Sequence, residues 1–255
     1  MSKVLLLDIE TAPTLAYVWK LWKENVGQEQ ILGRGYIMSC TLKFLDSDEV
    51  IYLENRTKND YKIVRTIMEY LDIADYVIAH NAKKFDVPFI KARAIVNNIP
   101  PCSPFKVIDT LEIARKEFLF SSNSLAALAT ELKCTPKRKH TKFSGFLLWA
   151  ACLEGNEEAW KEMEEYNKQD VLTLQEVYLK LRSWYEKHPN VTVEDELEPV
   201  FRCSKCGSDD VHLRGYYFTN SGKYHKYVCR ECGGWSRERY TSNSLEQRKK
   251  ILKAM

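Results

Sequence analysis

Two carboxylates follow an apolar stretch near the beginning of the sequence. Residues 4–7 are Val-Leu-Leu-Leu, and Asp8 and Glu10 come next with one residue between them. The apolar run predicts a buried strand, and because side chains alternate along a strand, both acids would lie on one side of the sheet. Two such charges repel each other and lose hydration, so a divalent cation would stabilise them. The alternative is a strand end that emerges into solvent, where both acids are hydrated.

Two further stretches carry acids in settings that suit the same site. Residues 80–88 are His-Asn-Ala-Lys-Lys-Phe-Asp-Val-Pro, and they place Asp86 between an expected strand and an expected helix. Active-site loops of open α/β sheets lie at such junctions, although Asp86 also fits the N-cap of that helix. Tyr166 and Asp170 are four residues apart, so on a helix they share one face. Their alternatives are a packed tyrosine and a solvated acid.

Together these stretches resemble the tyrosine subclass of the DEDD family of 3′→5′ exonucleases. The three motifs of that family, Asp-x-Glu, Asn-x-x-x-Phe-Asp and Tyr-x-x-x-Asp, match in this order Asp8 and Glu10, Asn81, Phe85 and Asp86, and Tyr166 and Asp170. The resemblance covers residues 1–187 and is strongest to the proofreading domains of B-type DNA polymerases. It implies an RNase H-like fold and a 3′→5′ exonuclease that hydrolyses phosphodiester bonds of nucleic acid, with DNA favoured over RNA.

The resemblance also implies a two-metal-ion site. Phosphodiester cleavage adds negative charge at the scissile phosphate and the leaving oxygen, and two Mg²⁺ or Mn²⁺ ions about 4 Å apart balance that charge. Carboxylates and water are the ligands that such ions prefer. By resemblance, Asp8 would bind both ions. Glu10 and Asp170 would complete the site of the ion that activates water, and Asp86 would hold the second ion through water.

The resemblance assigns roles to three more residues and leaves two neighbours without one. Tyr166 would orient the attacking water through its hydroxyl, and Asn81 and Phe85 would shape the pocket for the terminal nucleotide. His80 could be taken for a general base, but Tyr166 fills that role, so we expect a strand-end histidine with ordinary hydrogen bonds. Asp109 ends another strand and has no place in the motifs, so we expect it to cap a helix.

The elements that must position these residues follow from the apolar patterns. Strands are expected at 36–44, 49–53, 76–79 and 106–108, and helices at 59–73, 87–97, 123–132 and 157–187. Residues 13–32, which include Trp19 and Trp22, have a loosely helical pattern. Three antiparallel strands followed by alternating strands and helices predict an α/β fold with a mixed sheet flanked by helices.

Four cysteines in the last quarter of the sequence form two Cys-x-x-Cys pairs, Cys203 with Cys206 and Cys229 with Cys232. Such pairs are typical of tetrahedral Zn²⁺ sites, and a hairpin of strands at 211–218 and 223–229 fits between them. The segment resembles a zinc ribbon, and residues 224–235 are similar to ribbons of transposases. One Zn²⁺ would be structural, because so small a module builds little core of its own.

Charge is unevenly divided along the chain. Residues 201–255 contain 12 Lys and Arg against 5 Asp and Glu, a net charge of +7, whereas residues 1–200 contain 26 against 30, a net charge of −4. In the ribbon, basic residues alternate with aromatic ones, a combination that attracts phosphates and stacks bases. The alternative is a ribbon that binds protein. Residues 137–142 could steer a strand or be a solvated loop, and residues 248–250 are expected to be a frayed basic end.

The expected organisation is an RNase H-like domain at 1–192, a zinc ribbon at 200–240 and a basic tail at 241–255, with a linker around the acidic residues 194–198. Without a membrane-spanning run or a signal-peptide pattern, we expect a cytoplasmic protein, or an intracellular one in a host cell if viral, with reduced cysteines and no membrane partner. Nucleic acid is the expected partner, and a replication or repair protein is a possible one. A nucleic-acid-binding adaptor on a nuclease-like fold and an RNase H-like endonuclease stay open as alternatives.

Overall fold

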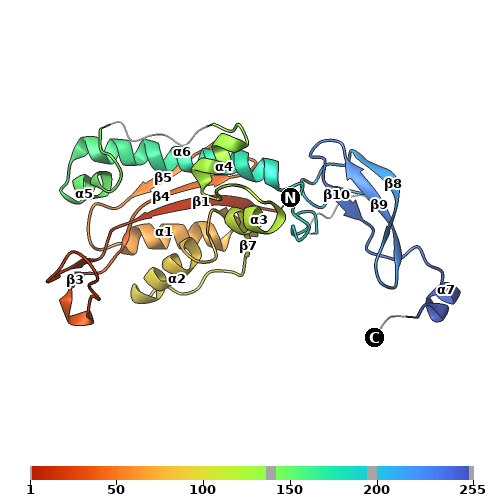
Figure 1. Cartoon of the computed structure of the whole chain (residues 1–255), viewed down its shortest axis with the longest axis horizontal. Coiled ribbons are helices and arrows are strands. Elements are labelled where there is room, and N and C mark those ends of the chain that lie inside the picture. The colour runs from red at the N-terminus through yellow and green to blue at the C-terminus, as the bar shows by residue number, and fades with distance from the viewer. Residues whose placement is uncertain (1, 136–141, 194–199, 253–255) are drawn as a thin grey trace. The chain divides into compact units, whose positions relative to one another are not determined.

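The computed structural model describes residues 2–135, 142–193 and 200–252, and it divides into two compact units (Figure 1). The larger unit comprises residues 3–178, and the smaller one comprises residues 1–2 and 179–255. The expected domain limits at 1–192, 200–240 and 241–255 stay predictions. In the part of the chain that the structure describes, no helix has both the length and the apolar character needed to cross a membrane.

The larger unit is built on a five-stranded mixed sheet with the strand order β5-β4-β1-β6-β7. Its strands are β1 Val4–Thr11, β4 Ile37–Phe44, β5 Ile51–Glu54, β6 Tyr76–Ala79 and β7 Lys106–Asp109. The central strand β1 pairs antiparallel with β4 and parallel with β6. The predicted meander of three antiparallel strands, continued by parallel strands, is therefore confirmed.

Helices cover both faces of this sheet (Figure 1). One face carries α1 Tyr61–Asp72 and α2 Asp86–Val96, and the other carries α4 Leu125–Glu131, α5 Leu147–Leu153 and α6 Glu157–Leu181. A further helix, α3 Thr110–Glu117, directly follows β7. This arrangement confirms the predicted α/β fold with helices on either side of a mixed sheet.

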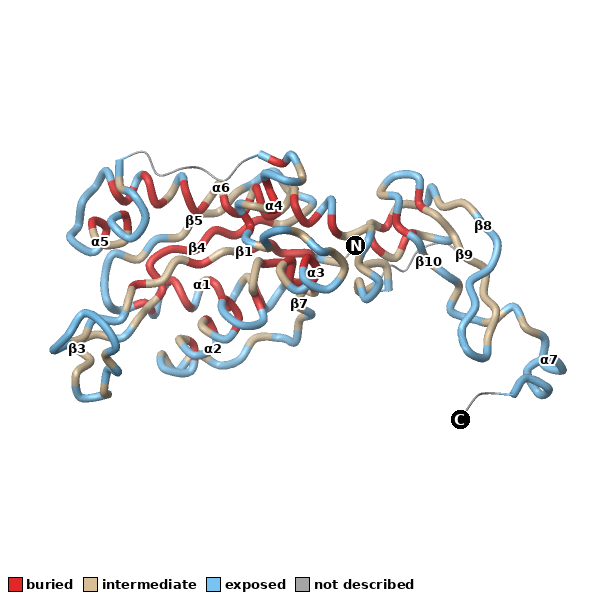
Figure 2. Tube along the Cα trace, viewed as in Figure 1, coloured by how far each residue is buried: buried red, intermediate tan, exposed pale blue. Residues whose placement is uncertain are grey.

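The alternation of β1 decides which side each of its residues faces. Leu5, Leu7 and Ile9 belong to the core that α1 and α2 complete, and buried residues run along β1 and β4 in Figure 2. Because neighbouring strand residues point to opposite faces, Asp8 and Glu10 lie on the other side, under α6. The apolar side of β1 thus anchors the strand, and its polar side is available for chemistry.

A buried acid fixes the first face of the sheet to its helices. Asp60, whose side chain is fully buried at the start of α1, accepts hydrogen bonds from the Ile37 N–H at 3.1 Å and from Arg93 Nε and Nη2 at 2.7 and 2.8 Å. Asn97 Nδ2 donates to the same carboxylate at 2.8 Å. Asp60 therefore ties β4, α1 and α2 together, and its charge is compensated by Arg93.

The expected helix at 13–32 is wrong. This segment forms two short paired strands, β2 Leu15–Ala16 and β3 Ile31–Gly33, with a 3-10 turn at Gln28–Gln30. Trp19 and Trp22 are 92% and 82% exposed. A helix here would have no surface against which to bury its apolar face, and helices of this length depend on such packing.

The smaller unit contains a three-stranded antiparallel sheet in the order β10-β9-β8, formed by β8 Val211–Phe218, β9 Lys223–Cys229 and β10 Trp235–Arg237. The helix expected at 157–187 ends already at residue 181. The frayed end expected at 248–250 is wrong, because these residues belong to α7 Leu245–Lys250. Ser244 and Gln247 form a capping box at its start, which satisfies N–H groups that would otherwise fray.

Candidate active site and metal centres

Three of the predicted metal ligands come together on the α6 side of the sheet. Asp8 and Glu10 from β1 and Asp170 from α6 each offer a carboxylate oxygen, and these oxygens all lie within 4.8 Å of one another. Asp170 is only 3% exposed. Three carboxylates this close repel one another strongly in a partly buried site, so a cation stabilises the arrangement. Hard oxygen donors of this kind fit Mg²⁺ or Mn²⁺.

A side-chain amide orients the first of these acids. Asn167, fully buried on α6, donates from Nδ2 to Asp8 Oδ2 at 2.7 Å, and its Oδ1 accepts from Thr41 Oγ1 at 2.9 Å and Ser39 Oγ at 3.3 Å. Thr41 lies directly opposite Asp8 in the sheet, and Ser39 lies opposite Glu10. The two hydroxyls hold the amide oxygen, so the amide nitrogen must face the carboxylate. This chain of contacts fixes the Asp8 side chain.

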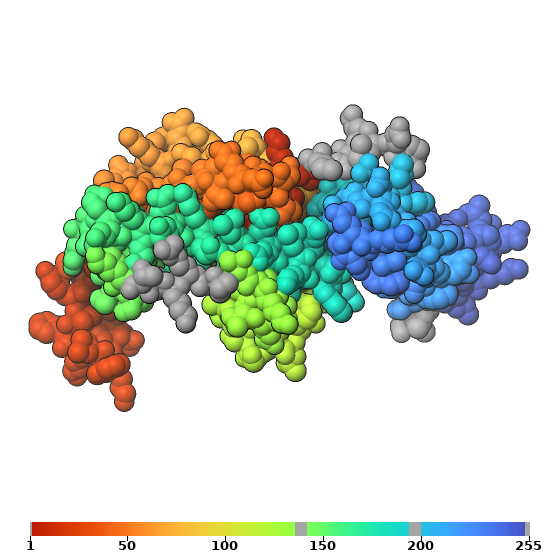
Figure 3. All heavy atoms as spheres, turned by 90° about the horizontal axis from the view of Figure 1, so that it is seen from above, coloured from red at the N-terminus to blue at the C-terminus, as the bar shows by residue number. Residues whose placement is uncertain are grey.

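An indole connects the second acid with the predicted tyrosine. Trp149 on α5 donates from Nε1 to Glu10 Oε2 at 3.2 Å. Its ring also meets the Tyr166 ring edge-on, with the centroids 5.9 Å apart and the planes at 78°. Tyr166 is 9% exposed and belongs to an apolar cluster with Met163 and Trp160. Trp149 therefore limits the movement of both Glu10 and Tyr166. The α5 and α6 atoms, green to teal in Figure 3, form part of the surface on this side of the larger unit.

Asp86 lies close to the acidic group but outside it. It is the first residue of α2, and Phe85 occupies the N-cap position, so the capping alternative for Asp86 is wrong. The Asp86 side chain is 2% exposed, and its carboxylate accepts a hydrogen bond from the Ile9 N–H, between the two acids of β1. Burial raises the pKa of Asp86 to about 7, the charge of Asp109 adds to this, and the backbone hydrogen bonds oppose it. Such a carboxylate would be charged more readily beside a cation.

The Cys40 thiol on β4 is affected by the charges of both Asp8 and Asp86. Cys40 lies opposite Ile9 on β4 and is fully buried. Burial raises the pKa of its thiol, and the charges of both Asp8 and Asp86 raise it further. The two carboxyl groups are therefore within electrostatic range of one residue. Asp86 itself is not one of the three acids whose carboxylate oxygens meet within 4.8 Å.

The two predicted substrate-binding residues in the loop before α2, Phe85 and Asn81, lie in different surroundings. Phe85 is 41% exposed and packs on Phe89 with the ring centroids 5.9 Å apart, so part of its side chain reaches solvent. Asn81 has a φ of +74°, and its N–H donates to Asp109 Oδ1 at 3.0 Å. It lines a pocket of about 300 Å³, together with the basic residues Lys83, Lys84, Arg115 and Lys116.

The expectations for Asp109 and His80 are confirmed. Asp109 caps α3, where its carboxylate accepts from the N–H groups of Leu111 and Glu112 at 3.0 and 3.3 Å. His80 contacts Thr110 Oγ1 at 2.9 Å through Nδ1 and the Asn123 carbonyl at 3.0 Å through Nε2. Both side chains are therefore engaged in holding the ends of β6 and β7. Of the basic segment 137–142, only Lys142 lies within the described residues, where it pairs with Glu158.

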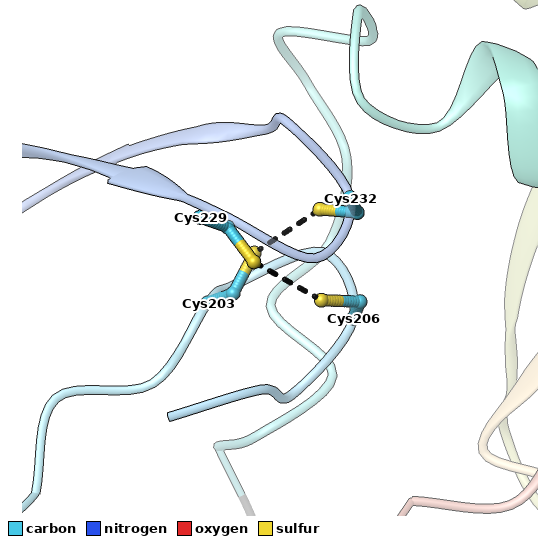
Figure 4. Close-up of side chains that lie close together, drawn as sticks. All are labelled: Cys203, Cys206, Cys229 and Cys232. Carbon is cyan, nitrogen blue, oxygen red and sulfur yellow. Dashed lines mark hydrogen bonds between the residues drawn. The ribbon is translucent and has the colours of Figure 1, made fainter. Parts of the chain in front are cut away.

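The four predicted zinc ligands also come together, in the smaller unit (Figure 4). The Sγ atoms of Cys203 and Cys232 are 3.6 Å apart, and those of Cys206 and Cys229 are 3.7 Å apart. In a tetrahedral site with Zn–S distances of about 2.3 Å, neighbouring sulfurs are about 3.8 Å apart, so the sulfurs fit a Zn²⁺ ion.

Glycines shape the two turns that carry the sulfurs. Gly207 and Gly233 follow the two Cys-x-x-Cys pairs with φ of +81° and +72°, a region that L side chains rarely adopt. In this conformation the Gly207 N–H donates to the Cys203 carbonyl at 2.9 Å, and the Gly233 N–H donates to the Cys229 carbonyl at 3.1 Å. These hydrogen bonds close each turn, and the two thiols of the turn then point toward the centre of the four-cysteine group.

Comparison with known proteins agrees with this fold. The family model described as the RNase_H superfamily matches residues 32–182. The chain belongs to the RNase H superfamily. The structure of the family B DNA polymerase from the hyperthermophilic archaeon Pyrobaculum calidifontis resembles this RNase H-like protein with a TM-score of 0.51 and 13% sequence identity. The match covers 72% of this chain and 26% of the polymerase, so the chain spans about a quarter of the polymerase's length. A search of the curated proteins found no match.

Sequence reasoning missed two residues of the RNase H-like site, Asn167 and Trp149. Asn167 follows Tyr166 directly, so on a helix it points about 100° away from it, and a pattern based on four-residue spacing passes over it. A polar residue on the apolar, sheet-facing side of an amphipathic helix was the available signal. Trp149 lies in α5, and the sequence offers no pattern that would pair its indole with Glu10.

Proposed function

We propose that this RNase H-like protein is a metal-dependent 3′→5′ exonuclease of the tyrosine subclass of the DEDD family, which hydrolyses phosphodiester bonds at the 3′ ends of nucleic acid and favours DNA. One observation carries the proposal. The carboxylate oxygens of Asp8, Glu10 and Asp170 lie within 4.8 Å of one another, with Tyr166 one turn before Asp170 on the same helix.

In this proposal the acids hold two Mg²⁺ or Mn²⁺ ions. Asp8, Glu10 and Asp170 would hold one ion, and Asp8 and Asp86 the other. The fit rests on the close approach of three carboxylates and on the burial of Asp86. When bound, such ions supply positive charge that activates a water and neutralises the leaving 3′ oxygen.

The side chains around the acids would keep the reacting groups in position. Asn167 and Trp149 hold Asp8 and Glu10 in fixed rotamers through their N–H donors. The Tyr166 hydroxyl would orient the attacking water, a role that depends on position more than on acidity. The partly exposed side chain of Phe85 would stack on the terminal nucleotide, and Asn81 would contact it through its side-chain amide.

The four cysteines would hold one structural Zn²⁺, and the ribbon around them would help bind the substrate. The S···S distances of 3.6 and 3.7 Å support the ion, and the net charge of +7 over residues 201–255 supports the binding role. A replication or repair protein would be a further partner of a chain with this activity.

The proposal is tested by incubating one single-stranded DNA, labelled in parallel samples at its 3′ or its 5′ end, with the full chain and Mg²⁺ or Mn²⁺. A 3′→5′ exonuclease releases the 3′ label at once as a mononucleotide and shortens the 5′-labelled strand stepwise. Internal fragments from both samples would indicate an endonuclease instead. Binding without any cleavage would indicate an adaptor on a nuclease-like fold.

The variant Asp8→Ala should abolish cleavage, because it removes a ligand of the metal ions. Binding of the DNA should stay largely intact, because the substitution removes no basic side chain that contacts phosphate. Glu69→Gln is the matched control, since Glu69 is an exposed acid on α1, on the other face of the sheet. Parallel RNA oligonucleotides establish the preferred sugar. Full activity of Asp8→Ala would refute the proposed site.

A further inference from the structure

The sheet of the ribbon has two faces of different character, which its register separates. Tyr217 pairs with Tyr224, and Arg237 pairs with Lys226. Because alternate residues of β9 share a face, Tyr224 and Lys226 lie on the same side, with Trp235 opposite Val228 next to them. We call these five residues, Tyr217, Tyr224, Lys226, Trp235 and Arg237, the aromatic–basic face.

The cations of this face lie over its rings. The Arg237 guanidinium is 4.2 Å from the Tyr224 ring centroid and 5.8 Å from that of Tyr217, and Lys226 Nζ is 5.4 Å from that of Trp235. Tyr217 and Trp235 are about half exposed, at 49% and 51%. Three rings from three strands are thus interleaved with two cations on a surface that reaches solvent.

The opposite face is occupied by residues of the same unit. Glu238 accepts hydrogen bonds there from the Tyr227 hydroxyl at 2.8 Å and contacts His225 Nδ1 at 2.9 Å. Phe201 stacks on Tyr227 with the ring centroids 4.9 Å apart. That side of the sheet therefore carries one acid, Glu238, and one cation, Lys223, whose Nζ is 3.7 Å from the Tyr216 ring centroid. The acid makes this face less attractive to a polyanion than a face with cations alone. Among the strand residues that the register places on it, the aromatic–basic face has two cations and no acid, whereas the opposite face carries Glu238 as well as Lys223.

We propose that the aromatic–basic face binds single-stranded nucleic acid, with unpaired bases stacked on Tyr217 and Trp235 and the backbone phosphates on Arg237 and Lys226. Every base has a π face, so stacking of this kind tolerates any sequence. In a duplex the bases are stacked on one another and their faces are inaccessible to a flat sheet. The face therefore selects unpaired strands. The inference rests on the proposed function in that the bound strand is the nuclease's substrate.

The test measures binding of a fluorescein-labelled strand of about 20 nucleotides, long enough for a stacking site. The full chain carries Asp8→Ala and no Mg²⁺ or Mn²⁺ is added, so the probe stays intact. Trp235→Ala and Tyr217→Ala should each weaken binding roughly 5- to 100-fold. Tyr216→Ala and Phe218→Ala are the matched controls, because these exposed aromatics lie on the opposite face of β8. The controls should stay within twofold of the unsubstituted ribbon.

Charge gives a second measurement. The slope of log affinity against log salt concentration is negative, and Arg237→Gln should make it less steep by about 0.7, the value for one phosphate contact on a single strand. The zinc content and thermal unfolding of each variant show whether the ribbon is intact. A blunt duplex of the same sequence should bind more weakly than the strand and should not respond to Trp235→Ala.

The inference is overturned if variants on both faces weaken binding equally, or if the duplex binds as tightly as the strand. It is also overturned if the variant that carries both Trp235→Ala and Tyr217→Ala retains its full zinc content and still binds the strand with normal affinity. Loss of the proposed nuclease activity would leave these binding results unchanged, so the two proposals fail separately.

Discussion

Replacing Asn167 by leucine removes the amide that lies between Asp8 and the hydroxyls of Ser39 and Thr41 while keeping the number and branching of the side-chain heavy atoms. Asn167 is fully buried, and its Nδ2 is 2.7 Å from Asp8 Oδ2. A hydrogen bond to a charged group stabilises a protein by about 1.5–3 kcal/mol, and each buried hydroxyl left without its acceptor costs about 1 kcal/mol. The free energy of unfolding should therefore fall by roughly 3.5–5 kcal/mol.

The same substitution should weaken metal binding, because Asp8 loses the donor that fixes its rotamer. Removing a side chain that orients a metal ligand typically lowers affinity about 10- to 100-fold. The assays are urea unfolding followed by tryptophan fluorescence and calorimetric titration with Mn²⁺ without nucleic acid. These readouts do not depend on nuclease activity.

Thr41→Val is the matched control. It removes the hydroxyl that donates to Asn167 Oδ1 at 2.9 Å and leaves the donor to Asp8 in place. It should cost about 1 kcal/mol of stability and change Mn²⁺ affinity little. In the double variant with Asn167→Leu, part of the stability should return, because the hydroxyl left without an acceptor is gone, and the Mn²⁺ affinity should stay low. Normal Mn²⁺ affinity of Asn167→Leu, or equal loss in Thr41→Val, would refute this reasoning.

Three other substitutions test separate parts of the structure. Trp149→Phe keeps an aromatic ring but loses the N–H that donates to Glu10, so kcat of the proposed cleavage should fall roughly tenfold with little change in Tm. Cys203→Ser should abolish zinc binding, measured as metal content, and expose the ribbon to limited proteolysis; a ribbon that stays protected without zinc would contradict a structural ion. Asp60→Asn should destabilise the larger unit by about 3 kcal/mol, because Arg93 loses its charged partner. Burial raises the pKa of Asp60, but the hydrogen bonds from Arg93 and its neighbours outweigh it and hold the pKa below its usual value. The difference in unfolding free energy between Asp60→Asn and wild type should therefore have its full size above about pH 4 and disappear as the pH falls through the lowered pKa of Asp60. A difference that stays constant down to pH 2 would contradict this prediction.

The local parts of the fold were predictable because their signals are local. The apolar run of residues 4–7 predicts a buried strand whatever its neighbours are, and the spacing of Ile63, Ile67 and Leu71 predicts one buried helix face, as α1 shows. The segment with Trp19 and Trp22 shows the limit of this reasoning. Its spacing suits a helix, but whether a partner surface exists is decided elsewhere in the chain, and here both rings remain exposed.

For the sites, the sequence by itself determined which chemical groups are available. Two acids on one side of a strand, an acid before a helix, a tyrosine and an acid one turn apart, and two Cys-x-x-Cys pairs can be identified from spacing, because strand and helix periodicities fix which side chains share a face. Only the tertiary structure decided which of them meet. Asp8 and Asp170 are 162 positions apart in the chain, and they meet because α6 packs on the polar side of β1.

The same distinction explains why Asn167, Trp149 and the aromatic–basic face of the ribbon needed the structure. Each depends on side chains from different elements that approach within hydrogen-bond or ring-contact distance, and such distances follow from packing between elements. The sequence determined that the ribbon is rich in aromatic and basic residues. The strand register placed five of them on one face and put Glu238 against the other, because pairing between strands fixes which side chains share a side.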